Sequence, residues 1–176
     1  SQPVIWKDCI YLTGAVSETD IRPANFADGL KSPQSMGVSL FAKAPDVTMQ
    51  WKLFCLELST GKTVWEQTIV EGKPKFPIHP SNSWATETPT VDDKGVCVLF
   101  GAAGIVAGVS HDGKVRWTKD VGVFKTSNGF GTGSSLTSHE GLVYVQNYNE
   151  ESAIVYAFDI QNGEEKWKYE RPEKVT

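Results

Sequence analysis

Three stretches of the chain share one pattern, a glycine turn followed four residues later by a tryptophan. They are CLELSTGKTVW (55–65), AGVSHDGKVRW (107–117) and AFDIQNGEEKW (157–167). Their glycines lie 52 and 50 residues apart, and their tryptophans keep the same spacing. The six repeated residues are Gly61, Gly113, Gly163, Trp65, Trp117 and Trp167. A fixed period of this size indicates a repeat architecture, so one structural unit is copied along the chain.

Short runs rich in β-branched and aromatic residues surround these turns, as expected of strands. The Asp-Gly and Asn-Gly pairs that end at Gly113 and Gly163 are typical of tight hairpins, because glycine adopts positive φ at little cost. A second repeat sets the size of the unit, since NSWATETPTV (82–91) aligns with NGFGTGSSLT (128–137). Each leads into a strand, a turn and a second strand, so the unit is four short antiparallel strands.

Four-stranded sheets at this period predict an all-β fold, a β-propeller with three four-stranded antiparallel blades. We expect the late tryptophan of each blade to pack against the neighbouring blade. Blade 1 spans 2–69 with an insertion at 17–50, blade 2 spans 86–121 and blade 3 spans 132–170. The expected strands are 2–6, 9–16, 51–58 and 63–69; 86–92, 95–101, 104–110 and 114–121; and 132–138, 142–148, 153–160 and 164–170.

The pattern A-x-D-x-x-x-G-x-x-x-W is similar to the signature of pyrroloquinoline-quinone (PQQ)-like propeller repeats. The third stretch matches it fully, with Ala157, Asp159, Gly163 and Trp167, whereas the second has Val109 in place of the acid. The resemblance covers nearly the whole chain, which we take as a single propeller segment, 1–176. The family that the pattern resembles includes quinone-dependent alcohol and glucose dehydrogenases. It also includes the barrel-assembly lipoprotein of the bacterial outer membrane, a scaffold that binds no quinone.

Three blades do not close a propeller, which typically has four to eight. Open blade faces would be left at both ends, and such faces associate. We therefore expect either a segment of a longer seven- or eight-bladed propeller, whose remaining blades would be its partners, or a ring of copies. The segment is favoured, because 1–4 begins inside an expected strand and 169–176 ends where another blade would begin.

Charge and hydropathy exclude several classes of function. The net charge is -4 with both signs mixed, so we expect no nucleic-acid partner. No apolar run approaches 18 residues, so we expect no membrane span. Cys9, Cys55 and Cys97 are too few and too widely spaced for a disulfide framework or a zinc site, and they fit small core positions. A secreted or periplasmic location is implied by the family resemblance alone.

Two expected loops lie on the propeller face where ligands usually bind, 71–87 and 122–133. The candidate ligand-binding residues in these loops are His79, Asn82, Trp84, Glu87, Lys125, Asn128 and Phe130. Their aromatic rings offer flat surfaces to a ring-shaped ligand, and their asparagines offer hydrogen bonds. The alternative is structural, since repeated asparagines cap turns and repeated aromatic residues pack between blades. Glu87 escapes that alternative, because Gly133 replaces it in the next unit, and it is a candidate channel-facing carboxylate.

Other chemistry finds little support. GFGTGSS (129–135) is followed by strands and not by the helix that a phosphate loop requires. His111 and His139 fall in hairpins of different blades, where we expect solvated turn histidines and no shared metal. None of the calcium-ligating, catalytic or arginine positions of quinone dehydrogenases transfers to this chain. PQQ and calcium therefore remain cofactors of the alternative function only.

The sequence thus favours a non-catalytic binding or scaffolding module in a secreted or periplasmic bacterial protein. Its ligand would be a protein partner, a small molecule or a carbohydrate, the last stacking on Trp84 and Phe130. The insertion at 17–50 carries apolar residues that would serve as a lid or a docking patch, or else form a family-specific surface excursion. The alternative function is part of a PQQ- and calcium-dependent alcohol or sugar dehydrogenase.

Overall fold

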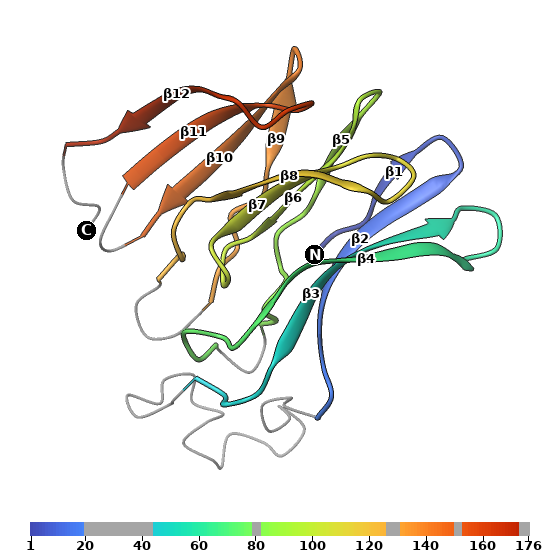
Figure 1. Ribbon diagram of the computed structural model, residues 1–176, viewed down its shortest axis with the longest axis horizontal. Coiled ribbons are helices and arrows are strands. Elements are labelled where there is room, and N and C mark those ends of the chain that lie inside the picture. Colours follow the sequence, from blue (N-terminus) through green and yellow to red (C-terminus); the bar gives the residue numbers. More distant parts are fainter. Residues whose placement is uncertain (20–43, 79–81, 126–130, 150–152, 173–176) are drawn as a thin grey trace.

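The computed structural model describes residues 1–19, 44–78, 82–125, 131–149 and 153–172 (Figure 1). These residues form twelve β-strands in three four-stranded antiparallel sheets. Within each sheet the strands follow one another in chain order. The predicted all-β propeller of four-stranded antiparallel blades is confirmed.

The twelve strands are short and joined by tight turns. Blade 1 consists of β1 (Val4–Trp6), β2 (Cys9–Ser17), β3 (Met49–Glu57) and β4 (Thr63–Gly72). Blade 2 consists of β5 (Thr90–Asp92), β6 (Gly95–Phe100), β7 (Ile105–Val109) and β8 (Val115–Asp120). Blade 3 consists of β9 (Thr137–His139), β10 (Leu142–Tyr148), β11 (Ala153–Asp159) and β12 (Glu165–Glu170).

The first strand of each blade is shorter than the sequence predicts. The expected strands at 86–92 and 132–138 pair only over their last residues. The preceding residues bind across to another blade instead: Thr86 Oγ1 donates to Thr132 O, and Thr88 N donates to Ser135 Oγ at 3.1 Å. These hydrogen bonds between blades take the place of the strand pairing that the longer expected strands would make within their own sheets.

The three blades stand side by side, with blade 2 between the other two (Figure 1). Strand β5 contacts both β1 and β9, so the first strands lie together on the inner side. Thr90 Oγ1 and Ser138 Oγ, 2.7 Å apart, join β5 to β9. This is the arrangement of consecutive propeller blades around an axis.

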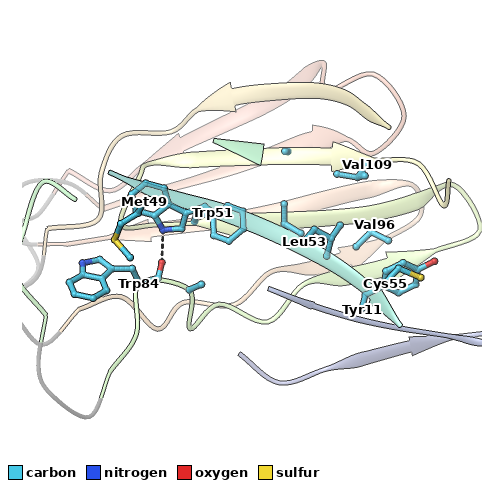
Figure 2. Packing of buried hydrophobic residues seen from close by; sticks show 12 residues of the cluster. Tyr11, Met49, Trp51, Leu53, Cys55, Trp84, Val96 and Val109 are labelled. Carbon is cyan, nitrogen blue, oxygen red and sulfur yellow. Dashed lines mark hydrogen bonds between the residues drawn. The ribbon is translucent and has the colours of Figure 1, made fainter. Parts of the chain in front are cut away.

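Two apolar clusters fill the spaces between blades. The first joins blade 1 to one face of blade 2, and Figure 2 shows Trp51 and Leu53 within it. The second joins the other face of blade 2 to blade 3 and includes Leu99 and Val145. Because blade 2 is covered on both faces, every residue of its β6 is buried, whereas only three of the seven residues of the equivalent strand β10 in blade 3 are buried.

The repeated tryptophans lie on the glycine turn of the following blade. Trp65 Nε1 donates to His111 O at 3.0 Å, and a Cβ on Gly113 would lie 2.9 Å from the Trp65 ring. Trp117 Nε1 donates to Ile160 O at 2.8 Å, and a Cβ on Gly163 would lie 2.6 Å from its ring. Glycine is required at these turns because only a residue without Cβ lets the indole approach.

The prediction of a solvated turn histidine is wrong for His111. Its Nδ1 lies 3.0 Å from Tyr11 Oη, and its Nε2 lies 2.9 Å from Asp92 O. Its ring also stacks on Trp6 at 6.1 Å between centroids. The hairpin of blade 2 leans on blade 1, and this contact turns a loop histidine into a link between blades. His139, by contrast, is largely exposed beside Glu140.

Candidate functional site

A groove opens between blades 2 and 3, where the β4–β5 and β8–β9 connections meet. Its volume is about 510 Å³. Each connection contributes one lysine, Lys75 from the first and Lys125 from the second. The other residues of the lining are Phe76, Asp120, Val121, Gly122, Val123, Asn147, Asn149, Ile154 and Tyr156. Both loops that the sequence identifies therefore border one groove.

The polar floor of this groove is held in place by the blades. Asn147 is almost fully buried, and its Nδ2 donates to Val121 O at 2.7 Å. Its Oδ1 accepts from Asn149 Nδ2 at 2.6 Å. Asp120 Oδ1 accepts from Gly122 N at 2.8 Å, which ties that carboxylate to its own turn. Two lysines and internally hydrogen-bonded amides therefore line the groove beside apolar side chains.

Glu87, the candidate channel-facing carboxylate, is fully buried among the described residues. Its Oε1 accepts from Gly101 N at 3.1 Å and from Thr132 Oγ1, while its backbone oxygen accepts from Thr13 Oγ1 at 3.1 Å. Burial raises the pKa of the Glu87 carboxyl, because the charged form loses its water. A Cβ on Gly101 would lie 2.8 Å from Oε1, so the approach requires glycine.

These contacts give Glu87 a place in the framework. Thr13 belongs to blade 1, Gly101 to the β6–β7 turn of blade 2, and Thr132 to the connection into blade 3. One carboxyl residue therefore links all three blades near the inner strands. Its Oε2 has no hydrogen-bond partner within the described part of the chain. A proton on the carboxyl reduces the cost of burying it there.

Trp84 and Asn82 also serve the framework. Trp84 is 8 % exposed and lies in the cluster between blades 1 and 2, where its backbone oxygen accepts from Trp51 Nε1 at 2.8 Å (Figure 2). Little of its ring is accessible for stacking on a sugar. Asn82 Oδ1 accepts from Ser83 N at 2.7 Å, and its Nδ2 donates to Thr132 O at 3.4 Å. It therefore holds a turn against the next connection.

The remaining predicted residues divide into two groups. Lys125 lines the groove. His79, Asn128 and Phe130 lie outside the described residues, as does most of the insertion at 17–50. Sequence reasoning missed Lys75, although it lies in a loop already identified. It also missed Asn147, a polar residue at an inward position of a strand, which the alternation of LVYVQNY indicates.

The described residues do not fit a calcium site of the quinoprotein kind. No group of three histidine, cysteine, aspartate or glutamate side chains converges among them. The buried carboxyl of Glu87 faces a backbone amide and a hydroxyl, both of which are donors. Calcium requires six to eight oxygen ligands, and the surroundings of Glu87 do not supply them.

Three antiparallel blades with their first strands together define a β-propeller segment. A family model described as "Outer membrane protein assembly factor BamB" matches residues 53–176. The chain belongs to this family of PQQ-like propeller repeats. No curated protein matches it significantly.

Solved structures of similar fold are much longer. A europium-containing methanol dehydrogenase aligns at 14 % identity and a TM-score of 0.50, over 70 % of this chain and 23 % of that chain. The quinohemoprotein alcohol dehydrogenase ADHIIG from Pseudomonas putida HK5 aligns at 15 % identity and a TM-score of 0.49, over 70 % and 19 %. The chain thus spans about a fifth of the length of these proteins. The likeness to the methanol dehydrogenase shows the fold alone. In the described residues no helix has the length and hydrophobicity to cross a membrane.

Proposed function

We propose that this chain is a non-catalytic binding or scaffolding module of a periplasmic or secreted bacterial protein. The observation that carries the proposal is the burial of Glu87. The one carboxylate among the predicted ligand-binding residues is fully enclosed and bonded to Gly101 and Thr132. It links blades and presents no oxygen to a substrate. The family match, described by the name of an assembly factor, supports the same role.

The ligand of this module is a segment of a protein partner that carries carboxylates. Lys75 and Lys125 border the groove from its two connecting loops, and ammonium groups form strong, charge-assisted hydrogen bonds to carboxylates. Phe76 and Tyr156 supply apolar walls against which a side chain packs.

A labelled glutamate-rich peptide tests this function. Binding is measured by fluorescence anisotropy for the wild type and for the double variant Lys75→Ala/Lys125→Ala. We expect the double variant to lose at least about tenfold in affinity and part of the salt dependence. The matched control, Lys62→Ala/Lys114→Ala, removes the same charge from exposed turns outside the groove. Equal losses in both double variants would show that net charge alone explains the effect. That result would contradict a binding site in the groove.

The alternative function, a PQQ- and calcium-dependent alcohol or sugar dehydrogenase, is tested on the same protein. PQQ, calcium, methanol or glucose, and an artificial electron acceptor are added together. The proposal expects no saturable binding of PQQ and no reduction of the acceptor. Turnover that depends on both PQQ and calcium would overturn the non-catalytic role.

A further inference from the structure

The connection between β8 and β9 forms part of the groove and is held near both of its ends. Its first part, 121–125, lines the groove through Val123 and Lys125, among others. Its last part reaches the interior at Thr132, which is 5 % exposed and bonded to Glu87. The position of Lys125 in the groove therefore depends on what holds this connection.

The first part is held by the β6–β7 turn of blade 2, 101–104. Val121 N donates to Gly104 O at 2.8 Å, and Phe124 N donates to Gly101 O at 2.9 Å. A Cβ on Gly104 would lie 2.6 Å from the carbonyl carbon of Gly122, so the turn and the connection are in direct contact. The segment that lines the groove thus follows the position of this turn.

Glu87 holds the turn and the last part of the connection at once. Its Oε1 accepts from Gly101 N at 3.1 Å and also from Thr132 Oγ1. All three groups are packed around Gly101, together with the ring of Phe124. A Cβ on Gly101 would lie 2.9 Å from Phe124 Cδ2 and 3.0 Å from Thr132 Cγ2. The carboxyl, the turn and both parts of the connection therefore meet at one point that has no room for a methyl group.

One oxygen is the common acceptor at this point. The Gly101 N–H and the Thr132 O–H both donate to it, and both hydrogen bonds are buried. Without that oxygen, two buried donors would lose their partner, which costs more than the same loss on the surface. We expect the turn and the connection to move apart in that case, since each donor would seek another acceptor or water.

We propose that Glu87 is a positioning residue for the groove, whose Oε1 fixes the β8–β9 connection and with it Val123 and Lys125. Glu87 itself is not among the residues that line the groove. It acts on the site through Gly101, whose carbonyl oxygen holds Phe124, the residue before Lys125. The effect on binding rests on the proposed function, in which Lys125 receives a carboxylate of the partner, whereas the positioning is a property of the chain without ligand.

Hydrogen–deuterium exchange of the chain without ligand tests the positioning. Glu87→Met keeps the length of the side chain and removes the acceptor, whereas Glu87→Gln keeps an oxygen that can accept both hydrogen bonds. We expect the amides of Val121 and Phe124 to exchange about tenfold faster or more in Glu87→Met, and less than about threefold faster in Glu87→Gln. The amide of Leu53, in β3 of blade 1, is the internal control and should change little in either variant.

Binding of the labelled glutamate-rich peptide tests the consequence for the groove. Fluorescence anisotropy is measured at a temperature where circular dichroism shows each variant to be folded. We expect Glu87→Met to lower the affinity by about fivefold or more and Glu87→Gln by less than about twofold. Leu53→Ala is the matched control, because it removes a fully buried side chain from the cluster between blades 1 and 2 and should bind as the wild type does.

The two measurements separate this role from the proposed function. Unchanged exchange of Val121 and Phe124 in Glu87→Met, or an acceleration that is as large at Leu53, would overturn the positioning role. Wild-type affinity in Glu87→Met would overturn it too, if Lys75→Ala/Lys125→Ala shows the expected loss. Faster exchange confined to the connection, with peptide binding that the double lysine variant leaves unchanged, would support the positioning and reject the acidic ligand.

Discussion

Blades 2 and 3 carry the same motif and differ in what covers it. Trp117 is 7 % exposed, whereas Trp167, at the equivalent position, is 43 % exposed. Both lie late in the fourth strand of a blade, four residues after a glycine of positive φ. The motif thus defines the shape of the blade, and the neighbouring blade determines how much of that shape is buried.

The sequence of blade 2 also differs in a way that suits its middle position. Its β6, GVCVLF, is apolar throughout, because Val98 faces blade 1 while Leu99 faces blade 3. In blade 3, β10 reads LVYVQNY, and its Gln146 is exposed. A strand buried on both faces is a continuous apolar run, whereas one with an open face alternates.

The largest expected effect is the loss of the buried tryptophan. Trp117→Ala should lower the free energy of unfolding by about 3–5 kcal/mol, because it removes a buried indole and its hydrogen bond to Ile160 O. Trp167→Ala in the dilute, monomeric chain should change it by less than about 1 kcal/mol. Urea unfolding of both variants measures the difference. Equal losses would contradict the role assigned to the neighbouring blade.

The paired glycines give the next largest difference. Gly163→Ala and Gly61→Ala impose the same left-handed strain, about 1–2 kcal/mol, since φ is +70° and +69°. Only at Gly163 does the new Cβ meet an indole, at 2.6 Å. We therefore expect Gly163→Ala to be less stable than Gly61→Ala by about 1–3 kcal/mol, as overpacking costs. Thermal unfolding at low concentration compares them, and similar melting temperatures would refute the close approach.

Glu87 predicts a pH dependence of the framework. Burial raises the folded-state pKa of its carboxyl above the ordinary 4.5, so the stability it contributes is complete below that pH. That contribution is lost as the pH rises through the raised pKa, since the folded chain must then ionise a buried group. Glu87→Gln cannot ionise, and its free energy of unfolding should fall less between pH 4.5 and 8. Parallel pH profiles for the two proteins would contradict the assignment.

The smallest effect is expected on the open face of blade 1. Lys52 Nζ lies 2.8 Å from Glu66 Oε1, and the Glu66 side chain is about half exposed. An ion pair of this kind contributes about 0.2–1 kcal/mol and weakens with salt. Lys52→Gln should therefore lower the free energy of unfolding by no more than that in urea titrations. A loss as large as that of Trp117→Ala would mean that this ion pair is buried, and would contradict an open face on blade 1.

Local and periodic features were predictable from the sequence. The spacing of Gly61, Gly113 and Gly163 predicts the repeating four-stranded blade, because each glycine marks a hairpin turn whose backbone needs positive φ. The partners of Glu87 were not predictable, since Gly101 and Thr132 lie 14 and 45 residues away and meet it only when blades pack. Glu87, a candidate ligand-binding residue in the sequence, is therefore a structural residue that links the blades.

The same reason explains the other differences. His111 lies in a turn that, by local sequence, faces solvent, but its hydrogen-bond partner Tyr11 is 100 residues distant. The groove between blades 2 and 3 is lined by Lys75, from the β4–β5 connection, and by Asn147, from β10. These two residues are far apart in the sequence and come to one groove only when the blades pack. Period and turn chemistry are encoded locally, whereas burial and site composition arise from contacts between units.

The central claim, that a neighbouring blade determines the burial of each repeated tryptophan, is tested most directly by fluorine NMR of the chain labelled with 5-fluorotryptophan. Tryptophan→Phe variants assign the resonances, and the shift between H2O and D2O reports the exposure of each ring. We predict a large solvent shift for Trp167 and a small one for Trp117 in the dilute chain. A shielded Trp167 in the monomer, or an exposed Trp117, would contradict the account.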